Sequence, residues 1–130
     1  METQITFFEK KLNFEIDAWD LHELVAKGEN VIIVDARSNE TYKNEHIPGA
    51  LNIPHRTMTT ENTAELDKKA LIVTYCDGIG CNASTKGALN MSRLGFKVKE
   101  LIGGIEWWKR DGYKTLGHKG VEAVSLYCDC

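Results

Sequence analysis

A continuous apolar run, Ala70-Leu71-Ile72-Val73-Thr74-Tyr75, is the feature that most constrains the fold of this chain. A strand with one face in water alternates apolar and polar residues, whereas a strand covered on both faces does not. Val31-Ile32-Ile33-Val34 is a second unbroken run, and it is entirely β-branched. Both runs predict strands near the centre of a parallel sheet whose two sides are covered.

The rest of the chain alternates helical with strand-like patterns. A helix is predicted over 18–27, because Asp17 is a suitable N-cap and Gly28 a suitable C-terminal stop. Further helices are predicted over 39–44, 83–94 and 103–110, and further strands over 50–53 and 97–102. Residues 55–69 are polar and hold at most a helical turn. This alternation predicts an α/β fold with a mostly parallel sheet and right-handed crossovers.

Length and composition predict a single domain. The chain has 130 residues, of which 42% are hydrophobic and 27% charged, close to the average for globular proteins. It shows no internal repeat and no composition shift that would mark a domain boundary. We therefore expect one domain over 1–130, with an N-terminal extension over about 1–14 and a C-terminal tail over about 114–130.

The absence of targeting signals and the net charge limit which classes of partner we expect. No window approaches the roughly 18 apolar residues of a membrane helix, and the N-terminus has no apolar signal region. These features predict a cytoplasmic protein without a membrane partner. The net charge of −3 lacks the basic excess that is typical of nucleic-acid-binding proteins, so we expect no nucleic-acid partner.

Cys76 is the residue with the clearest chemical potential. It directly follows the strongest predicted strand and precedes a glycine-rich turn into a helix. Ligands bind beyond the carboxyl ends of such strands. There the loop N–H groups and the helix N-terminus would favour a thiolate. This placement favours a nucleophilic cysteine, with a small buried structural residue as the alternative.

Several segments follow one another in a family's order and spacing. They are Val34-Asp35-Ala36-Arg37, the stretch 46–54 (HIPGALNIP), Thr74-Tyr75-Cys76, Leu94-Gly95-Phe96 and Ile102-Gly103-Gly104-Ile105, followed by Trp107-Trp108 and Gly112-Tyr113. With these segments the chain resembles the rhodanese superfamily over nearly its whole length. The resemblance implies a three-layer fold with a mostly parallel five-stranded sheet between helices. It also implies a sulfurtransferase without metal or organic cofactor, in which Cys76 carries sulfur as a persulfide.

The loop after Cys76 is expected to bind the substrate through its backbone N–H groups. It consists of Asp77, Gly78, Ile79, Gly80, Cys81 and Asn82, and resembles a rhodanese subgroup with a Cys-x-Gly-x-x-Cys-Asn loop. No basic residue occurs before Lys86, so anion stabilisation is expected to rest on the N–H groups and the helix end alone. Cysteine phosphatases need an arginine about five or six residues after the nucleophile. This chain has Cys81 and Asn82 there, which disfavours phosphatase activity.

The other cysteines have more than one interpretation. Cys81 can resolve an oxidised or persulfidated Cys76 as a disulfide, or it can simply pack beneath the loop, which is the favoured reading. Cys128 and Cys130 can form an inert tail or an exposed thiol pair that receives sulfur. A zinc site made from all four cysteines is disfavoured, because structural zinc ligands usually come in pairs two to four residues apart.

Four further residues are candidate supporting groups. Asp35 and Arg37 end a predicted strand, where they either form a structural turn and ion pair or contact the substrate. His46 is expected to stabilise a turn rather than to act as a base. Ser84 lies at the start of the helix that follows the loop.

Two functions of different classes remain open from the sequence. The first is a sulfurtransferase that accepts sulfur from a small anionic donor such as thiosulfate and passes it to cyanide or to a thiol, with a protein acceptor also compatible. The alternative is a rhodanese-like module that binds a partner or senses oxidants through Cys76 and Cys81 without turnover. The fold alone does not separate the two.

Overall fold

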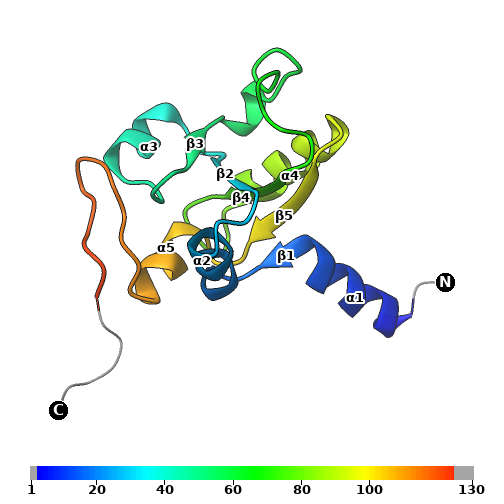
Figure 1. Cartoon of the computed structure of the whole chain (residues 1–130), viewed down its shortest axis with the longest axis horizontal. Helices are drawn as coiled ribbons and strands as arrows, with labels where there is room; N and C mark the ends of the chain where they lie inside the picture. The colour runs from blue at the N-terminus through cyan, green and yellow to red at the C-terminus, as the bar shows by residue number, and fades with distance from the viewer. Residues whose placement is uncertain (1–2, 125–130) are drawn as a thin grey trace.

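A five-stranded parallel sheet forms the centre of the computed structural model, which describes residues 3–124 (Figure 1). The strand order is β1-β5-β4-β2-β3, and every neighbouring pair is parallel. The strands are β1 (Glu15–Ile16), β2 (Val31–Asp35), β3 (Leu51–Asn52), β4 (Leu71–Tyr75) and β5 (Lys97–Leu101). The unbroken apolar run thus becomes the central strand β4, and the expected fold class is confirmed.

Helices cover both faces of the sheet, which gives three layers. The helices are α1 (Gln4–Phe14), α2 (Ala18–Ala26), α3 (Asn39–Asn44), α4 (Ala83–Arg93) and α5 (Gly104–Arg110), with a 3-10 turn η1 (His55–Thr57). Side chains alternate along β4 because successive residues of a strand point to opposite faces. Val73 and Tyr75 pack in the core formed with α2 and α5, whereas Ile72 packs in the core on the α4 side.

Side chains cap the starts of two helices, and α2 ends at its predicted glycine. The Asp17 carboxylate accepts a hydrogen bond from the N–H of Asp20, and Ser38 accepts one from the N–H of Thr41. Both caps satisfy N–H groups that a helix leaves without an internal partner. Gly28 follows α2 with a φ of +73°, as its predicted stop requires.

The N-terminal segment contains structure that the sequence patterns did not predict. Residues of the expected extension form α1, which projects from β1 away from the rest of the fold (Figure 1). This helix has no buried residue, and Ile5, Phe7, Phe8, Leu12 and Phe14 are each more than half exposed. The edge strand β1 is too short to show an alternating pattern, although its backbone pairs with β5.

Residues 115–119, at the start of the expected C-terminal tail, pack against the domain instead of extending from it. Thr115 is buried, and His46 and Leu116 form an antiparallel bridge. The N–H groups of His118 and Lys119 donate to the last carbonyls of α3. Backbone hydrogen bonds hold this segment against the domain. Such bonds require no apolar periodicity, so the sequence pattern did not predict that the segment is ordered. Cys128 and Cys130 lie outside the described residues, and no helix within residues 3–124 is long and apolar enough to cross a membrane.

Candidate functional site

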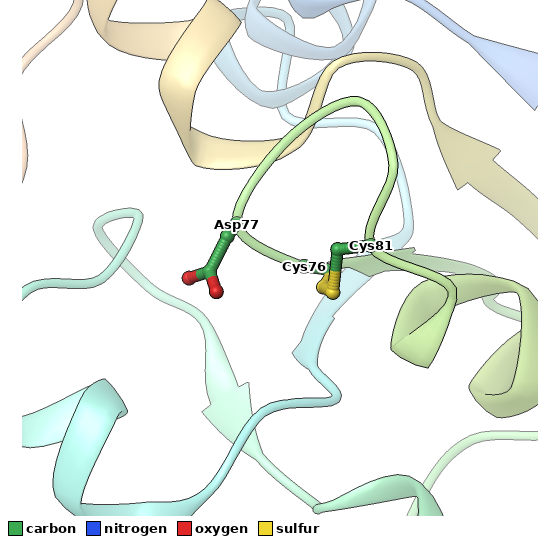
Figure 2. A group of neighbouring side chains, drawn as sticks. All are labelled: Cys76, Asp77 and Cys81. Atoms are coloured by element: carbon green, nitrogen blue, oxygen red, sulfur yellow. A yellow bond between two sulfur atoms is a disulfide. The ribbon is translucent and has the colours of Figure 1, made fainter.

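Cys76 lies at the carboxyl end of the central strand and is joined to Cys81 by a disulfide. The Cα atoms of the two cysteines are 6.3 Å apart, and the loop 77–80 arches between them. Figure 2 shows both sulfur atoms on the same side of the loop as the Asp77 carboxylate. Cys76 is only 1% exposed, whereas Cys81 is half-buried. The structure therefore brings Cys81 directly onto the candidate nucleophile.

The first turn of α5 holds the start of the loop through two backbone hydrogen bonds. The N–H of Ile105 donates to the Cys76 carbonyl at 3.0 Å, and the N–H of Glu106 donates to the Asp77 carbonyl at 2.9 Å. Gly104 has a φ of +58°, and a Cβ atom there would lie 2.3 Å from the Cys76 carbonyl oxygen. Only glycine fits both demands. Gly104 thus lets α5 approach the backbone of Cys76.

A buried polar network connects the ends of β2 and β4 to the loop. The Asp35 carboxylate is fully buried and accepts hydrogen bonds from the Arg37 guanidinium at 2.7 and 2.9 Å and from the Tyr75 hydroxyl at 2.8 Å. The guanidinium also donates to Asp77 at 2.9 Å and to the Glu45 carbonyl at 2.6 Å. Each guanidinium nitrogen therefore has a partner, and Arg37 connects the end of β2 to the loop after Cys76.

The network also sets the protonation of its members. Burial acts to lower the pKa of Arg37, but the hydrogen bond and negative charge of Asp35, with Asp77, raise it above its ordinary value. Burial, reinforced by the charge of Asp35, raises the pKa of Tyr75. Arg37 is therefore charged and the Tyr75 hydroxyl is a hydrogen-bond donor at neutral pH.

The cysteine pair borders a cleft of about 320 Å³. Its lining includes Cys76, Cys81 and Ala83, together with Pro54, His55 and Arg56. The cleft therefore contains a cationic side chain in addition to the backbone groups that the sequence analysis considered. Arg56 comes from η1, far from the loop in sequence, and brings an exposed guanidinium to the same cleft.

The 3-10 turn is positioned by hydrogen bonds from two directions. The N–H of His55 donates to the Ala36 carbonyl, and the Asn90 side chain of α4 donates to the His55 carbonyl at 2.8 Å. Gly87 allows this close approach, because a Cβ atom there would lie about 3 Å from the side chains of Met58 and Ala36. The turn that holds Arg56 is therefore packed tightly against α4.

His55 experiences the positive charge of the cleft. Its pKa is lowered from the ordinary 6.5, first by burial and then by the charges of Lys86 and Arg56. The neutral imidazole is thus the dominant form at neutral pH. Of these two cations, Arg56 lines the cleft beside Cys76, and its positive charge there favours an anionic ligand.

The loop presents additional hydrogen-bond donors. Within residues 3–124, the N–H groups of Ile79, Gly80 and Asn82 donate to no acceptor of the chain. The N–H of Cys81 closes a turn with the Gly78 carbonyl, and Gly80 has a φ of +94°. The Asn82 side chain does not cap α4, and Ile79 is 77% exposed.

Two of the supporting candidates do not reach the cysteines. The Ser84 hydroxyl donates to Glu100 at 2.7 Å, and its carbonyl accepts from Thr74. The His46 ring stacks on Tyr42 and its Nδ1 donates to the Tyr42 carbonyl at 2.7 Å. Ser84 and His46 are absent from the cleft lining, so both have structural positions.

Sequence reasoning missed Tyr75, His55 and Arg56. The sequence places Tyr75 in a strand and in the Thr74-Tyr75-Cys76 segment, but it does not indicate that the Tyr75 hydroxyl joins the Asp35 network. His55 and Arg56 directly follow Pro54, the last residue of the 46–54 motif, which was the only signal that could have drawn attention to them.

Cys76, Asp77 and Cys81 are a group of ligand-type side chains whose donor atoms lie within 4.8 Å of one another. In this structure the two sulfur atoms are bonded to each other, and Asp77 pairs with Arg37. The group therefore presents one exposed carboxylate and a disulfide, which is a poor donor set for a metal ion.

Comparison with known proteins identifies the family. The model of the rhodanese-like domain matches residues 17–111, which contain every element from α2 to α5. The chain belongs to the rhodanese-like domain family. It is 34% identical over 96 residues to the thiosulfate sulfurtransferase GlpE of Coxiella burnetii, covering 72% of this chain and 82% of that protein.

Two more similar proteins cover a larger part of the chain. A protein named sulfurtransferase from Allochromatium vinosum is 30% identical over 106 residues, with 82% of this chain and 97% of that protein covered. The crystal structure of the BH2092 protein from Bacillus halodurans superposes with a TM-score of 0.87 at 41% identity, covering 97% of this chain and 93% of that one. That match includes α1, which lies outside the family model.

Proposed function

We propose that this protein is a sulfurtransferase that moves a sulfane sulfur from thiosulfate or a similar small anion to a thiol or cyanide acceptor through a persulfide on Cys76. One observation carries the proposal: the Cys76 sulfur lies at the end of the central strand, beside a cleft lined by Arg56 and His55. The relatives named sulfurtransferase support the same activity.

The first half-reaction starts from the reduced protein. The Cys76 thiolate attacks the outer sulfur of thiosulfate, the sulfur–sulfur bond of thiosulfate breaks, and sulfite leaves with the bonding electrons. Arg56 and the N–H groups of Ile79, Gly80 and Asn82 are suited to hold the anionic donor. The α4 N-terminus adds a positive dipole end, which favours the thiolate over the thiol.

The second half-reaction returns the enzyme to its thiolate form. A thiolate or cyanide attacks the terminal sulfur of the persulfide, and the Cys76 thiolate is the leaving group. Arg37 does not take part directly, because its nitrogens are used to hold Asp35, Asp77 and the Glu45 carbonyl. Its role is to keep the loop in place.

The experiment that tests the proposal follows sulfite and protein mass together. After reduction and removal of the reductant, addition of thiosulfate should release one equivalent of sulfite per chain. Adding cyanide should then produce thiocyanate in repeated turnover. Cys76→Ser should release no sulfite, with an unchanged circular-dichroism spectrum. Sulfite release by the folded variant would assign the chemistry to another cysteine.

A redox-sensing module is the second candidate, and the Cys76–Cys81 disulfide is the observation that favours it. A sensor forms this disulfide with dilute peroxide and shows no turnover with thiosulfate. Steady thiocyanate production from thiosulfate and cyanide would therefore decide against a sensor without turnover.

A further inference from the structure

We propose that Cys81 is an internal acceptor for the sulfur chemistry of Cys76, so that the protein releases sulfide and forms its own disulfide without an external acceptor. This inference rests on the proposed persulfide on Cys76 and adds a second activity, the reduction of a sulfane sulfur at the expense of a dithiol. The structural basis is the Cys76–Cys81 disulfide, whose formation needs no rearrangement beyond the observed loop.

The positions of the two sulfur atoms favour the internal reaction. With Cys81 bonded to it, Cys76 is 1% exposed, so the Cys81 side chain occupies the approach to the Cys76 Sγ atom. Cys81 already reaches that atom, and both side chains lie on the same side of the loop (Figure 2). An attack from within the loop has a much higher effective concentration than an attack by a dissolved thiol.

The surroundings of Cys81 favour its reactive form. Cys81 lies just before α4, whose eleven residues present their positive dipole end to this loop. The carboxylate of Asp77 would oppose a second negative charge, but it pairs with Arg37 at 2.9 Å. A half-buried thiol next to a helix N-terminus and a neutralised acid is suited to react as a thiolate.

The chemical step balances without an added oxidant. The Cys81 thiolate attacks Sγ of the Cys76 persulfide, the bond between Sγ and the terminal sulfur breaks, and hydrosulfide leaves with the electron pair. The sulfane sulfur gains two electrons, and the two cysteines lose them on becoming a disulfide. The cleft that holds Arg56 receives the leaving anion.

An external dithiol then resets the enzyme. Its first thiolate attacks the Cys76–Cys81 disulfide, and its second thiol resolves the mixed disulfide, which restores two cysteine thiols. The more accessible Cys81 is the expected point of attack. The complete cycle converts thiosulfate and a dithiol into sulfite, sulfide and the oxidised dithiol.

A single-turnover experiment on the full chain tests this inference. Reduced protein is freed of reductant under anaerobic conditions, and one equivalent of thiosulfate is added without any acceptor. We expect one equivalent of sulfite and one of sulfide, and a protein lighter by two hydrogens with a Cys76–Cys81 linked peptide. Cys81→Ser should still release sulfite but at least tenfold less sulfide, and it should keep the added sulfur on Cys76 until a thiol is supplied.

The two readouts separate this inference from the proposed function. Absence of sulfite refutes the persulfide on Cys76. Sulfite without sulfide, or a sulfur atom found on Cys81, leaves the transferase intact and overturns the internal acceptor. Cys128→Ser/Cys130→Ser serves as the matched control and should release as much sulfide as the unmodified chain. Loss of sulfide in that variant would assign the acceptor role to the C-terminal pair instead.

Discussion

The Tyr75 hydroxyl donates a 2.8 Å hydrogen bond to the Asp35 carboxylate, which links the last residues of the two central strands β4 and β2. The same hydroxyl accepts from the N–H of Ile47 at 3.1 Å. Asp35 in turn binds Arg37, and Arg37 binds Asp77 of the loop. The loop after Cys76 is therefore held in position by Asp35 and Arg37, which lie at the end of the neighbouring strand β2.

Removal of that hydroxyl should destabilise the fold. Tyr75→Phe keeps the ring but leaves a buried N–H without its acceptor and a buried carboxylate with one donor fewer. We expect a loss of about 1–3 kcal/mol in the free energy of unfolding, measured by urea denaturation. Tyr42→Phe is the control, because its hydroxyl bonds only the Ala50 carbonyl in a part-buried position, and about 1 kcal/mol or less should be lost. Equal losses would contradict the importance of the network.

A methyl group at Gly104 should displace the nucleophile. Gly104→Ala adds a left-handed backbone penalty of about 1 kcal/mol and a Cβ atom that would lie 2.3 Å from the Cys76 carbonyl oxygen. Sulfite release should fall at least about tenfold, equivalent to about 1.4 kcal/mol in the barrier. Gly28→Ala has a similar φ of +73° with open space around it, so it should lose only stability. Full activity in a folded Gly104→Ala protein would show that α5 does not position Cys76.

The Arg56 guanidinium should strengthen the binding of the sulfur donor. Arg56→Gln should raise the KM for thiosulfate about fivefold, equivalent to about 1 kcal/mol, with a smaller change in kcat. The wild-type KM should also rise with salt, since the guanidinium is exposed. Arg93→Gln, at the far end of α4 and absent from the cleft lining, should change neither constant. A similar KM increase in both variants would indicate only a general charge effect.

Protonation of His55 should reduce stability in mild acid. Its pKa in the folded protein lies below 6.5, so the unfolded chain binds more protons between that lowered value and 6.5. Stability therefore falls as the pH decreases through this window and levels off below it. His55→Gln should flatten this part of the pH profile of urea unfolding. In an NMR titration, Lys86→Gln should move the His55 midpoint back towards 6.5; an unchanged midpoint would contradict the proposed electrostatic cause.

The chain's local patterns determined the elements near the centre of the sheet. Unbroken β-branched and apolar runs are typical of strands that are covered on both faces. For this reason β2 and β4 could be predicted from residues 31–34 and 70–75 without any tertiary information. The glycine-rich segment after Cys76 likewise marked the loop, and its place at a strand end marked the candidate nucleophile. Short elements such as β1 carry too few residues for a pattern.

The tertiary structure alone decided which side chains share the cleft. Arg56 and Cys76 lie 20 positions apart, and their meeting depends on the crossover that brings η1 against α4. The orientation of Ser84 towards Glu100, and of Tyr75 towards Asp35, likewise depends on neighbouring strands. Local sequence sets backbone preference over a few residues, whereas a site is made by groups that packing brings together from distant parts of the chain. For that reason the sequence indicated Cys76 as the candidate nucleophile, whereas the cationic side chain beside it became apparent only in the tertiary structure.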